Sequence, residues 1–113
     1  MTAYKRGDVV LVTFVFADET GVKLRPAVIV SSEAYHSGRD EVIIEAISSR
    51  TDRILVGDYL IKDWRRAGLL FPSVATGVVR TIRQNMIARK LGPMPSPEMK
   101  AIDDNLSVAL GLS

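Results

Sequence analysis

Runs of β-branched and aromatic residues, separated by polar segments that contain glycine, dominate the first half of the chain. Runs of this length without a helical period are typical of buried β-strands. They predict strands over residues 9–16, 26–31 and 41–48. Pro26 opens the second strand, where its missing N–H costs least, and it favours an extended backbone at the preceding residue, Arg25.

The middle of the chain holds shorter segments of the same kind. Residues 54–56 and 59–61 predict two short strand pieces, and residues 76–82 predict the last strand. Residues 63–68 predict a helical turn that ends at glycine, which readily adopts the left-handed conformation found after helices. The polar residues 32–40 predict a loop.

The period of the apolar residues changes towards the end of the sequence. Spacings of three and four residues predict an amphipathic helix whose apolar face is formed by Met99, Ile102, Leu106 and Leu110. Ser96 is expected to be the N-cap, Pro97 the first helical residue and Gly111 the residue that follows the helix. Residues 92–95 predict a rigid connector into this helix.

These elements indicate a mainly β protein with helices, of the α+β class. Several short strands in an open sheet would leave exposed edges, whereas closure into a barrel removes them. We therefore predict a small SH3-like β-barrel with a C-terminal amphipathic helix. A length of 113 residues suits one domain over 1–113 and leaves no room for a second core.

Composition narrows the class of protein further. With 47% hydrophobic and 25% charged residues, the chain can bury a core and is not a disordered segment. The absence of cysteine excludes disulfides, thiolate zinc sites and cysteine nucleophiles, and it suits a reducing compartment. The polar start of the sequence resembles neither a signal peptide nor a membrane span. We expect a cytoplasmic protein that does not bind a membrane.

The net charge of +2 is small, but the charges are unevenly distributed. Residues 57–100 hold 8 basic and 3 acidic side chains, an excess of +5. Such a local excess attracts a polyanion. On charge alone, a solvated basic face that acidic segments elsewhere balance explains the same pattern equally well.

Several kinds of catalytic site are missing from the sequence. It has no phosphate-binding loop, nucleotide-binding glycine motif, Gly-x-Ser-x-Gly elbow or His-Glu-x-x-His motif. The single histidine, His36, falls in a predicted loop, and Asp103 and Asp104 point in different directions on the predicted helix. We therefore expect no metal and no cofactor, so that any catalysis rests on arginine, lysine, hydroxyl or carboxylate groups.

Four short motifs occur in order along the predicted strands. They are Gly-Asp-Val at 7–9, Leu-Arg-Pro-Ala-Val-Ile-Val at 24–30, Ala-Ile-Ser-Ser at 46–49 and Arg-Thr-Ile at 80–82. In order and spacing they resemble the PemK/MazF family of toxins. With the amphipathic helix before Gly111, the resemblance covers about residues 5 to 110.

This resemblance implies a toxin of a type II toxin–antitoxin system. Such toxins are homodimers of SH3-like barrels that cut single-stranded RNA, including mRNA, at short sequences without metal, and an antitoxin protein silences them. In the family, the arginine of the Arg-Pro motif and a threonine at the end of the third strand handle the scissile phosphate. The corresponding positions here are Arg25 and Ser48.

The chemistry of metal-free RNA cleavage agrees with these two residues. Attack by the 2′-hydroxyl on the neighbouring phosphate creates a charged phosphorane that the enzyme must stabilise. The guanidinium of Arg25 can hold two phosphate oxygens with parallel hydrogen bonds, and the hydroxyl of Ser48 can donate one more. The structural alternative is that Arg25 pairs with a surface acid and Ser48 only ends a strand.

One departure from the family pattern keeps a second function open. Several relatives carry acidic, amide or basic side chains just before the Arg-Thr-Ile strand, whereas residues 75–78 here are Ala-Thr-Gly-Val. The alternative is a non-catalytic toxin of the same fold that binds and inhibits a protein target such as DNA gyrase.

A track for the RNA backbone is expected around the catalytic pair. Its candidate residues are Arg50, Arg53, Lys62, Arg65 and Arg66. Trp64 is a candidate for stacking on an unpaired base, the alternative being a rim aromatic packed on the barrel. We expect the phenylalanines, Phe14, Phe16 and Phe71, in the core or in a dimer contact rather than against bases.

Overall fold

The computed structural model describes residues 4–15 and 22–112. Its strands are β1 (Asp8–Val15), β2 (Val22–Ile29), β3 (Glu41–Ser48), β4 (Tyr59–Leu60), β5 (Val74–Arg83) and β6 (Ile87–Pro93). Its helices are α1 (Glu33–His36), the 3-10 turn η1 (Gln84–Met86) and α2 (Ser96–Leu110). The described strands form one antiparallel sheet in the order β4-β5-β3-β2-β1-β6.

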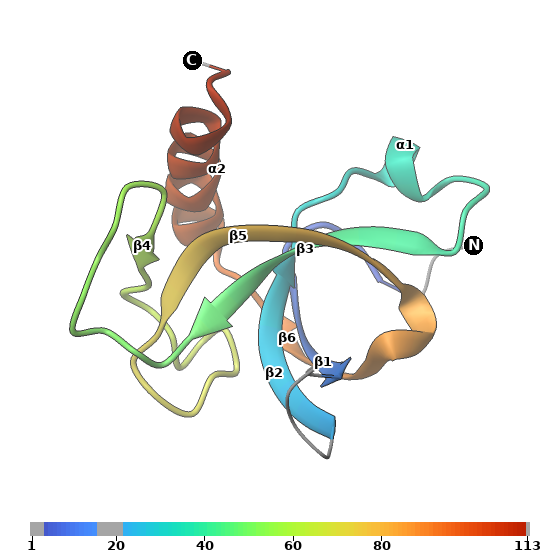
Figure 1. Cartoon of the computed structure of the whole chain (residues 1–113), viewed down its shortest axis with the longest axis horizontal. Helices are drawn as coiled ribbons and strands as arrows, with labels where there is room; N and C mark the ends of the chain where they lie inside the picture. The colour runs from blue at the N-terminus through green and yellow to red at the C-terminus, as the bar shows by residue number, and fades with distance from the viewer. Residues whose placement is uncertain (1–3, 16–21, 113) are drawn as a thin grey trace.

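The sheet is strongly bent, and β5 curves along its length before the chain turns through η1 into β6 (Figure 1). Register shifts interrupt the β1–β6 and β3–β5 pairs, and such bulges bend a strand. The predicted fold class, a small barrel-like β protein with a C-terminal helix, is therefore confirmed. Pairing does not close the described sheet, since β4 and β6 are its two edges.

Both faces of the sheet are buried around β1, β2 and β3, which explains the apolar runs in these parts of the sequence. Along β1, Val9 belongs to one core cluster and Val10 and Val12 to another, because successive side chains point to opposite faces. The first cluster packs against α2 through Met99 and Ile102. The second fills the other face.

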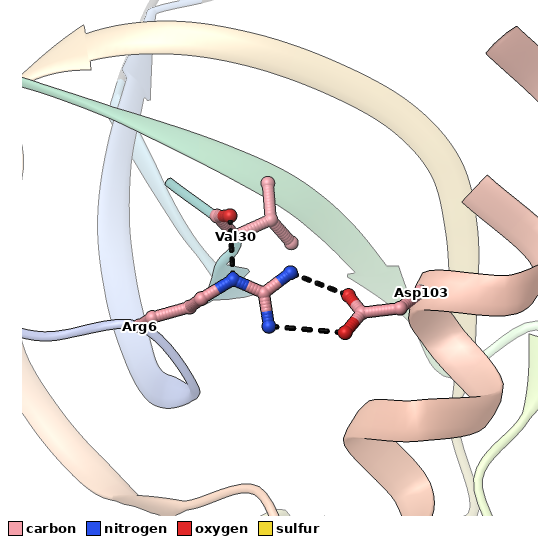
Figure 2. Close-up of polar contacts among 3 residues, drawn as sticks. All are labelled: Arg6, Val30 and Asp103. Atoms are coloured by element: carbon pink, nitrogen blue, oxygen red, sulfur yellow. Dashed lines mark hydrogen bonds and ion pairs between the residues drawn. The ribbon is translucent and has the colours of Figure 1, made fainter. Parts of the chain in front are cut away.

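Contacts from the start and from the middle of the chain hold α2 in place. The Arg6 guanidinium donates to the Val30 carbonyl at 3.0 Å and makes two hydrogen bonds to Asp103 on α2, at 3.1 and 2.5 Å (Figure 2). In the first turn of α2, the buried Glu98 carboxylate accepts from the Tyr59 hydroxyl and the Asp63 N–H. The helix thus joins the segment before β1 to the segment around β4.

Four of the predicted elements differ in the structure. The second strand, predicted over 26–31, runs over Val22–Ile29, so Pro26 lies within it, opposite Leu11, and does not open it. Residues 87–93, which include the first two residues of the predicted connector, form strand β6 and pair with β1. This strand carries no apolar run, because only Ile87 is buried and its middle is exposed. Residues 54–56 form no strand, and residues 33–36 of the predicted loop form the single turn of α1, which is too short to show a period.

The residues that begin and end α2 and the turn at 63–68 agree with the sequence prediction, except at the start of α2. Gly111 has a φ of 72° and donates to the Val108 carbonyl, as predicted for the residue after α2. Pro95, not Ser96, occupies the N-cap position and no side chain caps the helix, so the predicted start was wrong by one residue. The predicted turn at 63–68 is present and ends at Gly68 with a φ of 84°. No helix in the described ranges is long and apolar enough to span a membrane.

A carboxylate lies in the core without a full set of partners. Glu45 on β3 is 1% exposed, and one of its oxygens accepts from the Gly77 N–H at 3.0 Å. The other oxygen, Oε1, has no hydrogen-bond partner among the described residues. Burial raises the pKa of Glu45 from 4.5 to about 7; the Gly77 N–H opposes this rise, and the charges of Asp103 and Asp58 add to it.

This carboxylate predicts a pH-dependent stability. Because its folded pKa lies above its unfolded value, the folded protein binds the extra proton between about pH 4.5 and 7. The free energy of unfolding is therefore expected to fall with rising pH across this window, by up to about 3 kcal/mol, and then to level off. Urea unfolding at pH 5 and pH 8 measures this difference. Glu45→Gln is expected to remove it and Glu41→Gln, on the same strand, to keep it; an equal fall in both variants would contradict the assignment.

Candidate RNA-binding site

A cavity of about 580 Å³ is lined by residues of the sheet and of the segment that connects β4 to β5. Strands β1, β2, β3, β5 and β6 each contribute to its wall. Most of this wall is apolar, and the larger apolar side chains are Leu24, Leu69, Leu70, Phe71, Val78 and Leu91. Seven residues of the two predicted strand motifs line it: Leu24, Arg25 and Pro26 of the first, and Ala46, Ile47, Ser48 and Ser49 of the second.

Strand register brings Arg25 and Ser48 to the same cavity. The β2–β3 pairing ends at Ala27 opposite Ala46. Because pairing is antiparallel, two more residues along each strand place Arg25 opposite Ser48 and on the same face of the sheet. The Ser48 hydroxyl oxygen accepts the Arg50 N–H at 3.1 Å, so its own O–H remains a donor.

Two further arginines line this cavity, and the sequence had not assigned either of them to the site. Arg80 comes from β5 and Arg89 from β6. On β1, Leu11 pairs with Pro26 on one side and with Arg89 on the other, so β6 brings Arg89 within two strand spacings of the Arg-Pro motif. The basic excess of residues 57–100 was a signal for both, but Arg89 required β6 to be recognised as a strand.

All the ionisable side chains that line the cavity, among the described residues, are cationic. Its ionisable side chains are the three guanidinium groups of Arg25, Arg80 and Arg89, and no carboxylate or imidazole of the described residues lines it. His36 lies elsewhere, buried at 3% exposure and hydrogen-bonded to Ser31. The described ranges contain no group of three side chains suited to holding a metal ion. The cavity therefore suits an anion that carries an apolar portion.

The six residues predicted for the RNA track line no part of this cavity. Arg50 pairs with Asp52 at 3.0 Å, and the Arg65 guanidinium lies 4.4 Å from the centre of the Trp64 ring. Trp64 itself is half-buried against the core cluster under α2, as in the rim-packing alternative. Arg53 and Lys62 are exposed, and Arg66 lies 3.7 Å from Asp63. Their role in RNA binding stays a prediction.

The sequence of this chain matches a known family over nearly its whole length. Residues 5–110 match the PemK-like, MazF-like toxins of type II toxin–antitoxin systems. The chain belongs to this toxin family. The resemblance drawn from the four short motifs is thereby confirmed, although no curated protein sequence matches the chain.

Solved structures of similar fold are toxins of the same kind. A mycobacterial endoribonuclease in complex with its cognate antitoxin is 22% identical, with a TM-score of 0.78 and 98% coverage of each chain. The Mycobacterium tuberculosis toxin MazF-mt6 is 22% identical, with a TM-score of 0.75, covering 94% of this chain and 98% of its own. In the MazE–MazF complex of Deinococcus radiodurans, the matching chain is 17% identical, with a TM-score of 0.80 and full coverage of both. At these identities the likeness establishes the MazF-like fold.

Proposed function

We propose that this MazF-like toxin is an endoribonuclease that cuts single-stranded RNA, including mRNA, at specific sequences and without a metal ion. The observation that carries the proposal is the cavity in which Arg25 and Ser48 meet two further guanidinium groups. A cleft with several fixed cations, one hydroxyl donor and apolar walls suits a nucleotide, whose phosphate is anionic and whose base is largely apolar.

In the proposed reaction, the 2′-oxygen forms a bond to the neighbouring phosphorus and loses its proton. The bond from phosphorus to the 5′-oxygen of the next nucleotide then breaks, and that oxygen gains a proton. The products are a 2′,3′-cyclic phosphate and a free 5′-hydroxyl. The intermediate phosphorane carries more negative charge than the ground state, so preformed cations and donors stabilise it preferentially.

Each residue of the cavity has a distinct part in this proposal. Arg25 holds two non-bridging oxygens with its planar guanidinium, and Ser48 donates its hydroxyl proton to one of them. Arg80 adds charge from the facing strand. Because the described lining contains no carboxylate or imidazole, we assign charge stabilisation, and not proton transfer, to this pocket.

The partners follow from membership of the family. The similar structures include an endoribonuclease with its cognate antitoxin and a MazE–MazF complex. We propose that this chain likewise forms a homodimer in the cytoplasm, where mRNA is its substrate and an antitoxin protein its inhibitor.

Incubation of the purified protein with a long RNA in EDTA tests the proposed activity. The expected result is cleavage at reproducible sequences that leaves cyclic phosphate ends and that is strongly slowed in Arg25→Ala. Intact RNA with wild-type protein, at concentrations that stall a topoisomerase such as DNA gyrase, would instead establish the non-catalytic alternative.

Ser48 offers a finer test of the same pocket. Ser48→Ala removes one hydrogen bond to a charged group and is expected to lower the cleavage rate by about 10- to 100-fold. Ser48→Thr restores the hydroxyl with a stiffer rotamer and is expected to keep most of the activity. Single-turnover cleavage of a short RNA measures both rates. Equal rates for Ser48→Ala and the wild type would remove Ser48 from the site.

A further inference from the structure

Two large apolar side chains stand exposed beside the cavity. Leu70 is 82% exposed and Phe71 is 62% exposed, and both line the cavity wall. Phe71 was expected in the core or in a dimer contact; it belongs to neither core cluster, and the dimer contact stays a prediction. An exposed aromatic ring next to guanidinium groups is the arrangement by which proteins hold unpaired bases.

The backbone that carries Phe71 is firmly anchored on both sides. Before it, Leu69 is 7% exposed in the core, and its N–H donates to the Trp64 carbonyl at 3.1 Å. After it, the Ser73 hydroxyl donates to the Phe71 carbonyl at 2.7 Å. Ser73 is 3% exposed, and its own carbonyl accepts the Ile61 N–H. The ring is therefore presented by an ordered segment, which lowers the entropy cost of stacking on it.

Arg89 lines the same cavity as Phe71. Among the residues that the structure describes, its guanidinium makes no hydrogen bond or ion pair. The adjacent Lys90 differs, because its ammonium lies 3.2 Å from the buried Asp8 carboxylate. Arg89 thus keeps its donors for a ligand in the cavity, whereas Lys90 has a structural partner.

We propose that Phe71 and Arg89 form a nucleobase subsite next to the scissile phosphate. An unpaired base of the RNA stacks on the Phe71 ring, and Arg89 holds the phosphate that joins this nucleotide to its neighbour. This inference rests on the proposed nuclease function and extends it to a part of the substrate that Arg25 and Ser48 do not contact. An apolar protein segment would also fit against Phe71, but three guanidinium groups in one cavity favour a polyanion.

Removal of single bases from the substrate tests the subsite directly. A short RNA with a mapped cleavage position is prepared with one abasic nucleotide at each position in turn. Wild type and Phe71→Ala are compared on every substrate, both in cleavage and, in the Arg25→Ala background, in binding measured by fluorescence anisotropy. For one position near the cleaved bond, base removal is expected to weaken wild-type binding about 5- to 100-fold and to leave Phe71→Ala unaffected.

Matched variants separate the contribution of base stacking from the loss of apolar surface or of charge. Leu70→Ala removes the neighbouring, more exposed apolar side chain and is expected to keep the full sensitivity to base removal. Phe71→Trp is expected to retain it as well. Arg89→Gln is expected to weaken RNA binding and to lower the slope of log affinity against log salt by about one, whereas Arg83→Gln, outside this cavity, is expected to leave binding unchanged.

Each result decides between the two proposals. If the wild type cleaves RNA but base removal weakens binding by Phe71→Ala as much as binding by the wild type at every position, the base subsite is wrong and the nuclease function stands. In that case the exposed pair is left as a surface for a protein partner. If no RNA is cleaved but removal of a base from an RNA that the protein binds weakens binding only for proteins that retain Phe71, the nuclease function is wrong and base stacking on Phe71 stands.

Discussion

Replacement of Arg25 by alanine is expected to lower the rate of RNA cleavage by about 100- to 1000-fold, the cost of losing one well-placed donor to a developing oxyanion. The loss should appear mainly in kcat, since the guanidinium is aimed at charge that grows in the transition state. Single-turnover cleavage of a short RNA at saturating protein isolates this step from binding.

Arg25→Lys is the matched control for this prediction. Lysine keeps the positive charge but cannot donate two parallel hydrogen bonds, so an intermediate rate is expected. Because Arg25 is exposed, both variants should keep a melting temperature close to that of the wild type. Wild-type cleavage by Arg25→Ala would show that this cavity is not where the phosphate reacts.

Gly68→Ala is expected to cause the largest loss of stability among simple substitutions, about 3 kcal/mol or more. Gly68 has a φ of 84°, a backbone conformation that residues with a Cβ atom rarely adopt. A Cβ there would also lie 2.7 Å from the Leu91 carbonyl carbon and closer still to its oxygen. Both atoms belong to the backbone of β6, so relief requires the sheet edge and the segment with Phe71 to move apart.

Gly38→Ala separates the two causes of this loss. Gly38 has a similar φ of 77°, but no atom lies within 4 Å of the position that its Cβ would take. Its substitution should therefore cost only the backbone strain, about 1 kcal/mol. Urea unfolding of both variants measures the difference, which is the steric contribution at Gly68. Equal losses would show that the contact between Gly68 and β6 is not tight.

The strands that hold the proposed catalytic pair were visible in the sequence for a physical reason. Because both faces of the sheet are buried, β1, β2 and β3 are continuous apolar runs with few competing interpretations. Arg25 and Ser48 lie at the ends of two such runs, so their proximity followed once these strands paired.

The positions of Arg89 and Phe71 in the cavity could not be predicted from the sequence, because the segments that carry them show no hydrophobic period. Strand β6 is an edge strand with an exposed middle, so its sequence resembles a polar connector and Arg89 had no predicted position. The core placement expected for Phe71 from its residue type was wrong, because hydrogen bonds of Ser73 and Leu69 hold its backbone where the ring is exposed. Such exposure depends on the tertiary path of the segment and not on local composition.

The pairing of β1 with β6 also determines when, during synthesis of the chain, the proposed RNA site can form. Asp8 pairs with Pro93, 85 residues later in the chain. At about 5–20 residues per second, a ribosome takes roughly 4 to 17 s to make the intervening segment. Throughout that time β1 lacks its outer neighbour, and the proposed RNA site lacks Arg89 and Leu91. The proposed RNA site is therefore complete only after residues 89–91 have been synthesised and β6 has paired with β1, so a shorter nascent chain is not expected to cleave the message that encodes it.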